Sequence, residues 1–521
     1  MKKITIIFFI LILIIITSIY TIFNIYIRLE NKKEKKEDIN SKEKITSTDL
    51  RIGITNFDNI NPILSENINV QNISRLIFEP LINLSYDYRL EECLATEWNK
   101  IDKNQYLIKL RENVKWQDDK KFNSDDVIFT INMLKELKEK SIYYYNVKDI
   151  ESIKKIDEYT IVITTKKEIS YFEYNLIFPI MSSKYFSEKN FMQANENLNP
   201  IGTGMYYIED NNPNNIVLKK NNEWWNNKEL KIENITINLY NNINEEISDI
   251  GSNKIDLITS STIDIDKYID DTRNNIKKYV GRNYNYLVFN CNNYILEDKN
   301  IRQAINYGIN KEEIIKNVFQ DKYIKSEFPL DFGCYLYNKN SERTSYDKSK
   351  ANKILKENKI RNINLKLLVN KDKDNEVKVA NLIKEQLEDI GIEININERS
   401  EKQYKDDLKK SNFDIAILEN IYSFSPNLSL YFGEDNISNY KNESIINLLR
   451  NMERNMERNI EEKSRKDIET IREYYNKDVP FISLYYDTNT LIYTKNLKGE
   501  FTPNAYNIFY NIENWYREYD K

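Results

Sequence analysis

Hydrophobic positions along this chain repeat with two spacings, and the spacing changes from one segment to the next. Apolar residues alternate with other residues at 50–54 and at 392–396, which predicts strands. They recur at spacings of three and four over 127–134 and over 380–390, which predicts helices. Strands alternating with helices predict an α/β fold with covered sheet faces. We expect the folded body to begin near Asp49.

The stretch from residue 283 to residue 319 combines a strand with two helices. Residues 284–289 are aromatic and β-branched, which is typical of a strand, and 301–307 carry apolar residues on helical spacing. Asn310 is followed three residues later by Glu313, whose carboxylate can accept a hydrogen bond from the backbone of the capping residue. This pattern predicts the start of a second helix.

The same alternation continues towards the C-terminus. Residues 404–409 are expected to form a helix and 413–418 a further strand. Residues 444–476 are rich in charge and predict a long, solvated helical region.

The N-terminus carries an uncharged run from Ile4 to Ile27. As a helix it would span about 36 Å, enough to cross a hydrocarbon layer of about 30 Å. A cleaved signal peptide has a shorter apolar region and a small-residue cleavage site, so an uncleaved transmembrane anchor is favoured over a cleaved signal. Lysines lie on both sides of the run, which leaves the orientation open. Residues 28–48 are polar and predict a tether.

Composition excludes several kinds of chemistry. The chain has no histidine, so a Ser-His-Asp or Cys-His nucleophile and a His-ligated metal are excluded. Cys93, Cys291 and Cys334 are far apart, which predicts unpaired and mostly buried thiols. The net charge of −5 is small and mixed, so no nucleic-acid partner is implied. No catalytic residues, metal or cofactor are expected.

Two short patterns have structural explanations. Gly202-Thr203-Gly204 lacks the lysine of a phosphate-binding loop, which favours a tight turn. The pairs Asp118-Asp119 and Asp125-Asp126 lie at a predicted turn and a predicted helix start, where carboxylates satisfy free N–H groups.

A series of segments, in order along the chain, resembles the extracellular solute-binding proteins of peptide-type ABC importers, which bind oligopeptides, dipeptides or nickel (bacterial solute-binding family 5). The resemblance covers the chain after about residue 49. The segments that carry it are Phe78-Glu79-Pro80-Leu81, Leu110-Arg111 with Val114-Lys115-Trp116, Ser124 to Leu134, Gly202 to Tyr206, Asn221 to Trp225, Asn290 to Lys311, Asp347 to Leu355, Gln386 to Ile392, Phe413 to Ala416 and Val479-Pro480-Phe481.

The resemblance implies a two-lobed fold like that of periplasmic binding proteins, in the large three-subdomain variant of type II. Lobe I is expected to comprise residues 49–282, with an inserted subdomain at about 85–195, and to be completed by 486–521. Lobe II is expected to comprise 283–485.

The resemblance also implies where a solute would bind. Phe78, Glu79 and Leu81 match a segment that runs beside the ligand in this family. Glu79 is predicted to be either a ligand contact or a member of a structural ion pair. Arg302, on the crossing between lobes, is predicted to form a structural ion pair or to contact the ligand.

The second lobe is expected to contribute the loop that follows the strand at 413–418. Many peptide-binding relatives hold the ligand's free amine with an aspartate here, and this chain has Tyr422 or Ser423 in that place. Glu419 is predicted either to substitute for it or to be a solvated carboxylate. The predicted contacts from this loop and from the lobe crossing, where buried tyrosines need hydroxyl partners, are Glu419, Asn420, Tyr422, Ser423, Phe424, Tyr284, Tyr286, Tyr485 and Tyr486.

These expectations define a non-enzymatic receptor held on the extracellular face of the cell membrane by a single-pass anchor. It is expected to be a monomer that binds a peptide or similar small solute and delivers it to an ABC permease with its ATPase. The alternative is a sensory or interaction ectodomain on the same scaffold, which signals rather than transports.

Overall fold

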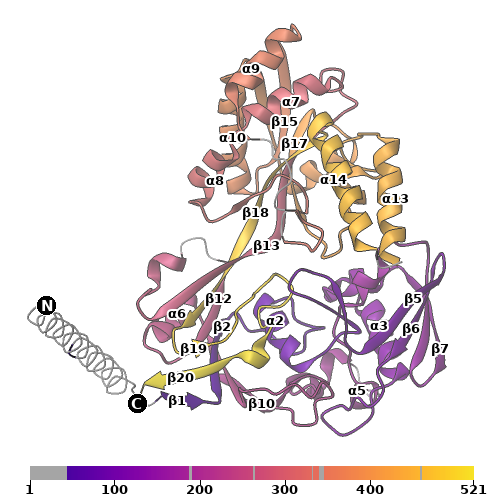
Figure 1. Ribbon diagram of the computed structural model, residues 1–521, viewed down its shortest axis with the longest axis vertical. Coiled ribbons are helices and arrows are strands. Elements are labelled where there is room, and N and C mark those ends of the chain that lie inside the picture. The colour runs from indigo at the N-terminus through magenta and orange to yellow at the C-terminus, as the bar shows by residue number, and fades with distance from the viewer. Residues whose placement is uncertain are drawn as a thin grey trace, which may run out of the picture.

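The computed structural model describes Thr21 and residues 44–186, 191–261, 265–330, 333–338, 345–457 and 460–520 (Figure 1). Apart from Thr21, the predicted anchor at 4–27 lies outside these residues, as does most of the predicted tether. No helix within the described ranges is both long enough and apolar enough to cross a membrane.

One large mixed sheet runs through the molecule. In spatial order its strands are β16 (Ile392–Arg399), β15 (Ile363–Asn370), β17 (Ile415–Ile421), β13 (Asn274–Phe289), β18 (Phe481–Thr494), β12 (Leu257–Ser260), β2 (Asp49–Thr55), β11 (Asn234–Tyr240), β10 (Asn215–Lys220) and β9 (Tyr206–Asn211), with β14 (Ile324–Lys325) beside β18.

The two long strands β13 and β18 join the two lobes of the molecule (Figure 1). We call the lower part in that view, which contains β2 and β9–β12, lobe I, and the upper part, which contains β15–β17, lobe II. The antiparallel pairing of β13 with β18 extends from Asn274–Thr494 to Val288–Phe481 and is interrupted between Val280 and Tyr284. Such an interruption adds local twist and bends the strands at one place.

Lobe I contains three smaller sheets and the helices packed on them. The sheets are β5 (Ala95–Asp102) with β6 (Gln105–Leu110), β8 (Thr160–Thr165) and β7 (Ile150–Asp157); β3 (Ile82–Leu84) with β4 (Leu90–Glu92); and β1 (Lys44–Ser47) with β20 (Tyr516–Asp520) and β19 (Leu497–Lys498). The helices are α2 (Ile68–Ile77), α3 (Ser124–Leu137), α4 (Tyr144–Val147), α5 (Ser183–Phe186) and α6 (Ile243–Gly251). Short 3₁₀ turns lie at Lys138–Lys140, Phe172–Leu176, Phe191–Gln193, Asn195–Leu198, Ile265–Tyr268 and Ile512–Asn514.

Lobe II surrounds its part of the sheet with helices. They are α7 (Lys299–Gly308), α8 (Lys311–Phe319), α9 (Lys348–Glu357), α10 (Asp374–Glu388), α11 (Glu401–Lys409), α12 (Ser429–Phe432), α13 (Glu443–Glu457) and α14 (Glu461–Asp478). The lower ends of α13 and α14 face the β5–β8 sheet of lobe I (Figure 1).

Several local predictions are confirmed by the structure. Asn123 caps α3 and forms a capping box with Asp126 at the predicted helix start. Asn310 caps α8 as expected, because its side chain accepts from the Glu313 backbone, but the Asn310 N–H donates to Gln386 instead of the predicted Glu313 carboxylate. Gly391 has a φ of +84° just beyond α10, a conformation that favours glycine. The three cysteines are free, and Cys93 and Cys334 are buried.

Other elements differ from the prediction because long-range pairing decides them. The strand expected at 284–289 is the last part of the longer β13, which pairs with β18 on both sides of the interruption. The charged region at 444–476 is helical, as expected, and is divided between two helices, α13 and α14. Residues 44–47 lie inside the predicted tether but form β1, because β20 at the far end of the chain supplies the partner strand.

The two faces of the crossing strands belong to different cores. On one face, Tyr284, Tyr286 and Tyr486 join a cluster that also contains Tyr88 and Tyr174 of lobe I. On the other face, Leu287, Phe289 and Tyr485 pack with the helices of lobe II. Residues of alternating parity along a strand point to opposite faces, which separates Tyr485 from Tyr486.

Candidate functional site

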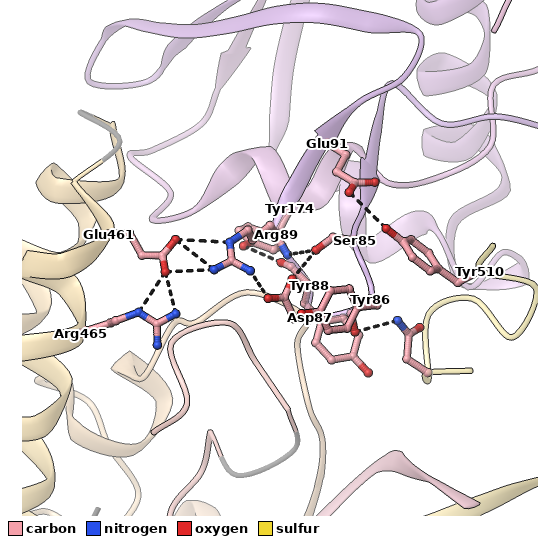
Figure 2. A network of polar contacts seen from close by, with 11 residues as sticks. Ser85, Tyr86, Asp87, Tyr88, Arg89, Glu91, Tyr174, Glu461, Arg465 and Tyr510 are labelled. Atoms are coloured by element: carbon pink, nitrogen blue, oxygen red, sulfur yellow. Dashed lines mark hydrogen bonds and ion pairs between the residues drawn. The ribbon is translucent and has the colours of Figure 1, made fainter. Parts of the chain in front are cut away.

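The tight turn at residues 85–89, between β3 and β4 of lobe I, is one of the places where lobe I contacts lobe II (Figure 2). The Ser85 hydroxyl donates to Asp87 Oδ1 at 2.6 Å and accepts from the Arg89 backbone at 2.9 Å. Tyr88 has a φ of 66°, which allows the chain to reverse within these few residues. We call residues 85–89 the junction turn.

Arg89 in the junction turn forms a polar contact with lobe II (Figure 2). Its Nη2 lies 3.0 Å from Glu461 Oε1 on α14, and Arg465 Nη2 lies 2.6 Å from the same oxygen. Arg89 also pairs with Asp87. Partial burial raises the pKa of Glu461, but the hydrogen bonds from Arg89 and Arg465 outweigh it and hold the pKa below its usual value. A carboxylate of one lobe is therefore kept charged by an arginine of the other.

Uncharged groups also join the junction turn to its surroundings. The Tyr335 backbone of lobe II donates to the Asp87 carbonyl at 2.8 Å. The Tyr174 hydroxyl donates to the Tyr88 carbonyl at 3.0 Å, and the Asn504 side chain donates to the Tyr86 carbonyl at 3.0 Å.

A cavity of about 650 Å³ opens beside the junction turn and is lined by both lobes. Lobe I contributes Trp98 and Lys100, and lobe II contributes Glu453 on α13. Lys100 Nζ lies 2.8 Å from Glu168 and 3.8 Å from Glu453. The cavity is within the size range of ligand sites, but the positive charge of Lys100 on its wall is already paired with Glu168 and Glu453.

Five of the predicted site residues form one aromatic cluster at the lobe crossing. The Tyr284 and Tyr286 rings are stacked with centroids 5.1 Å apart, and Tyr486 lies 5.0 Å from Tyr284. The Tyr284 hydroxyl is 2.6 Å from Ser483 Oγ. The remaining members are Tyr422 and Phe424, and Phe424 stacks on Tyr88 of lobe I at 5.2 Å.

The other predicted residues of lobe II are divided between different environments. Tyr485 packs on Phe319 and Tyr323 at the opposite face of the sheet. The Asn420 side chain donates to the Tyr286 hydroxyl at 2.9 Å. Glu419 is exposed and pairs with Lys373 at 2.8 Å.

Ser423 lies on the loop after β17 and is exposed, with its hydroxyl 3.0 Å from the hydroxyl of Ser425. Among the predicted contacts from this loop, Ser423 therefore has a different environment from its buried neighbours Tyr422 and Phe424.

Phe78, Glu79 and Leu81 lie inside lobe I. The Glu79 carboxylate accepts from Thr203 Oγ1 at 2.8 Å, Trp224 Nε1 at 2.9 Å and Trp225 Nε1 at 2.8 Å. Burial raises the pKa of Glu79 to about 7, although these three bonds oppose the shift. The sequence left open whether Glu79 forms an ion pair. In the structure, neutral hydrogen-bond donors surround its carboxylate instead.

The backbone next to Glu79 is also committed within lobe I. The carbonyls of residues 79, 80 and 81 accept from the backbone N–H groups of Ile180, Leu94 and Ala95. Arg302 likewise has a structural environment, because it is buried and donates to the carbonyls of Leu296, Asp478 and Val479. The expected ion pair of Arg302 is replaced by these carbonyl contacts.

Sequence reasoning missed two arginines that lie over aromatic rings near the lobe crossing. Arg282 on β13 donates to the Tyr422 carbonyl and lies over the Phe424 ring, with Cζ 4.4 Å from the centroid. Arg75 on α2 lies 3.6 Å over the Tyr506 ring. Arg75 is the only charged residue of a largely buried helix, and this isolation was the signal available in the sequence.

The fold is a mixed α/β, two-lobed solute-binding fold, and comparisons with known proteins agree. A family model for bacterial extracellular solute-binding proteins, family 5, matches residues 89–438. This match covers more than half of the chain. The protein therefore belongs to family 5 of the bacterial extracellular solute-binding proteins, which are transport receptors and not enzymes.

Individual relatives are distant. The dipeptide-binding protein of Escherichia coli is 27% identical over 290 residues, which is 51% of this chain and 54% of that protein. The chain thus spans about half the length of the first curated relatives that it matches. The putative peptide-binding protein AppA from Clostridium difficile has a TM-score of 0.70 at 22% identity and covers 90% of this chain and 99% of that one. HbpA2 from Haemophilus parasuis has a TM-score of 0.77 at 20% identity, with 91% and 100% covered.

Proposed function

We propose that this protein is the extracytoplasmic receptor of an ABC importer and binds a peptide or similar small solute between its lobes. One structural feature supports this proposal more than any other. β13 and β18 run side by side through both lobes, and their pairing is interrupted at residues 281–283. Two strands that bend at one place act as a hinge around which lobes can close on a solute.

The surroundings of the hinge suit such closure. The hydrogen bonds and ion pairs of the junction turn with α14 are polar and partly exposed, so they can break and re-form at small cost. The cavity beside them is lined by both lobes and is large enough for a small peptide. Peptides are the proposed solutes because the dipeptide-binding protein of Escherichia coli and the di/tripeptide-binding protein 1 of Pseudomonas aeruginosa are among the relatives.

The receptor function can be tested with the full-length protein in mild detergent. A mixture of di- to pentapeptides is added, bound species are identified by native mass spectrometry, and lobe closure is followed by small-angle scattering. We expect a bound peptide and a smaller radius of gyration. Absence of both changes would contradict the proposal. The sensory alternative would be favoured if the purified protein binds peptide but a strain that lacks the protein still takes up peptide normally.

We further propose that residues 4–27 anchor the receptor in the membrane, with the folded body outside the cell and its permease beside it. The support is the length of the uncharged run, about 36 Å as a helix. Cell fractionation followed by N-terminal sequencing tests this proposal. We expect the protein in the membrane fraction with its N-terminal segment retained, and a soluble protein that begins after residue 27 would refute the anchor.

A further inference from the structure

The cavity beside the junction turn, which we call the interlobe cavity, has an acidic wall. Among its described lining residues, glutamates outnumber basic residues by five to two. The glutamates are Glu92, Glu97, Glu173, Glu453 and Glu461, and the basic residues are Arg89 and Lys100. Glu173 lies on the 3₁₀ turn at Phe172–Leu176 of lobe I, and Glu453 lies on α13 of lobe II, so carboxylates line the cavity from both lobes. A cavity with an excess of one charge sign attracts solutes of the opposite sign.

Both basic residues of the wall already have carboxylate partners. Arg89 lies 3.0 Å from Glu461. Lys100 lies 2.8 Å from Glu168, which is outside the lining, and 3.8 Å from Glu453. The negative excess of the wall therefore remains after these pairs have formed.

Ion pairs with residues outside the lining do not reverse this excess. Glu92 and Glu97 pair with Arg111 and Lys109 at 3.2 and 2.8 Å, but the two glutamate side chains are half exposed or more, and pairs at such positions contribute little. Among the described ion pairs, the partners outside the lining are the bases Arg111, Lys109 and Arg465 and the acids Asp87 and Glu168.

Two lining tyrosines respond to the same negative charges. Burial raises the pKa of Tyr106, and the carboxylates of Glu173 and Glu453 raise it further. Lys100 opposes this shift but does not cancel it. Burial also raises the pKa of Tyr171, where Glu453 and Glu173 contribute in the same direction. The two carboxylates, one from each lobe, thus act on the same wall of the cavity.

Aromatic rings give the interlobe cavity a second means of holding a cation. The rings in its wall belong to Trp98, Tyr106, Tyr171, Tyr174 and Tyr335. Arg89 already uses one of them, because its Cζ lies 4.8 Å from the centroid of the Tyr335 ring while its Nη2 pairs with Glu461. A guanidinium group between a ring face and a carboxylate is the arrangement expected for a bound basic side chain.

We propose that the interlobe cavity binds the basic side chain of a peptide solute, and that this receptor therefore selects peptides with arginine or lysine over neutral or acidic peptides of the same size. The inference rests on the proposed receptor function and specifies its solute class. A cation that contacts both Glu173 and Glu453 would draw the two lobes together. A free guanidinium compound carries the same chemistry, and the experiment separates it from a peptide.

Five probes test the proposal by calorimetry on the full-length protein in mild detergent. They are Ala-Arg-Ala, Ala-Lys-Ala, Ala-Met-Ala, Ala-Glu-Ala and agmatine. Charge-assisted hydrogen bonds predict a dissociation constant at least roughly tenfold lower for Ala-Arg-Ala than for Ala-Met-Ala. Ala-Lys-Ala should lie between these two, because an ammonium group lacks the planar fork of a guanidinium group, and Ala-Glu-Ala should bind most weakly of the four peptides.

Agmatine carries a guanidinium group without a peptide backbone. It should bind at least about tenfold more weakly than Ala-Arg-Ala, because it lacks the contacts of the backbone. Equal affinity for agmatine and Ala-Arg-Ala would overturn the peptide as the source of the cation.

Variants assign the selectivity to the wall of the cavity. Glu173→Gln and Glu453→Gln should each reduce the preference for Ala-Arg-Ala over Ala-Met-Ala to less than about threefold. Lys100→Gln removes a positive charge and should instead increase the preference, by about threefold. The matched control is Glu443→Gln, because Glu443 is exposed and begins the same helix as Glu453. Effects of opposite sign cannot come from a general loss of structure, and if one glutamine variant of a glutamate does not fold, the other provides the same measurement.

The outcomes separate this inference from the receptor function. Equal affinities for the arginine, methionine and glutamate peptides, or an unchanged preference in both Glu173→Gln and Glu453→Gln, would overturn the inference and leave the receptor function standing. No binding by any probe, together with no change in scattering, would overturn both.

Discussion

Two glutamates of this protein show how different surroundings reverse the behaviour of one residue type. Glu79 lies inside lobe I among Thr203, Trp224 and Trp225, and its pKa is raised to about 7. Glu461 lies between the lobes beside Arg89 and Arg465, and its pKa is below its usual value. Neutral donors do not compensate for full burial, whereas two arginines at a partly exposed site do.

The comparison teaches which glutamate can contribute to lobe movement. Glu79 is fixed in the interior of one lobe and holds three donors in place. Glu461 forms an ionic contact across the boundary between lobes, where water can replace its partners when the lobes separate. We therefore expect changes at Glu79 to affect stability and changes at Glu461 to affect closure.

The largest expected effect comes from removing the Glu79 side chain. Glu79→Ala leaves two indole N–H groups and one hydroxyl without their acceptor and opens a void, so the free energy of unfolding should fall by about 4 kcal/mol. Urea unfolding followed by fluorescence measures this loss. Glu223→Ala is the matched control, because Glu223 precedes Trp224 but is exposed and pairs only weakly, at 3.5 Å, with Lys115. A loss at Glu79 no larger than at Glu223 would contradict the role of the buried carboxylate.

The pKa of Glu79 gives the second prediction. Folding raises this pKa from 4.5 to about 7, so between these values the folded protein holds a proton that the unfolded chain has lost. Stability should therefore decrease as the pH rises through this window, by about 3 kcal/mol in total from Glu79. Glu79→Gln should remove this part of the slope, whatever its absolute stability. Glu246 and Glu376 also have raised pKa values, so the difference between the protein and the variant is the quantity to measure.

The sequence predicted the fold better than it predicted the surroundings of the candidate residues. The Asn123 and Asn310 caps depend on neighbours within three residues, so local patterns were sufficient for them. The surroundings of Glu79 depend on Thr203, Trp224 and Trp225, which are more than 120 residues away. No local pattern contains that information.

The interlobe contacts were beyond sequence reasoning for the same reason. Arg89 and Glu461 are 372 residues apart, and Arg282 and Tyr422 are 140 residues apart. The sequence predicts both Tyr485 and Tyr486 as ligand contacts, but the structure places them on opposite faces of β18. The pleat of a strand allows at most one of two adjacent residues to face a given side.

A smaller effect is expected for the contact between lobes. Glu461→Gln removes the charge that Arg89 and Arg465 share, but these side chains are more than a third exposed, so the free energy of unfolding should fall by no more than about 1 kcal/mol. The matched control is Glu462→Gln, since Glu462 is the next residue of α14, is exposed and pairs with Lys466 on the same helix. Scattering should detect a larger radius of gyration for Glu461→Gln alone. Identical scattering for the two variants would show that the contact does not hold the lobes together.

The smallest expected effect is a change in the radius of gyration with pH, which distinguishes Glu461 from Glu79. The folded pKa of Glu461 is depressed, so its contribution is present above the unfolded value of 4.5 and is lost as the pH falls through the folded pKa. The radius of gyration should therefore increase on acidification below about pH 4.5, and added salt should reduce the difference because it screens the exposed pair. Glu461→Gln should show no such increase. Because Glu79 acts between 4.5 and about 7 and Glu461 below 4.5, an increase that began in the higher window would assign lobe opening to the interior of lobe I and not to the junction turn.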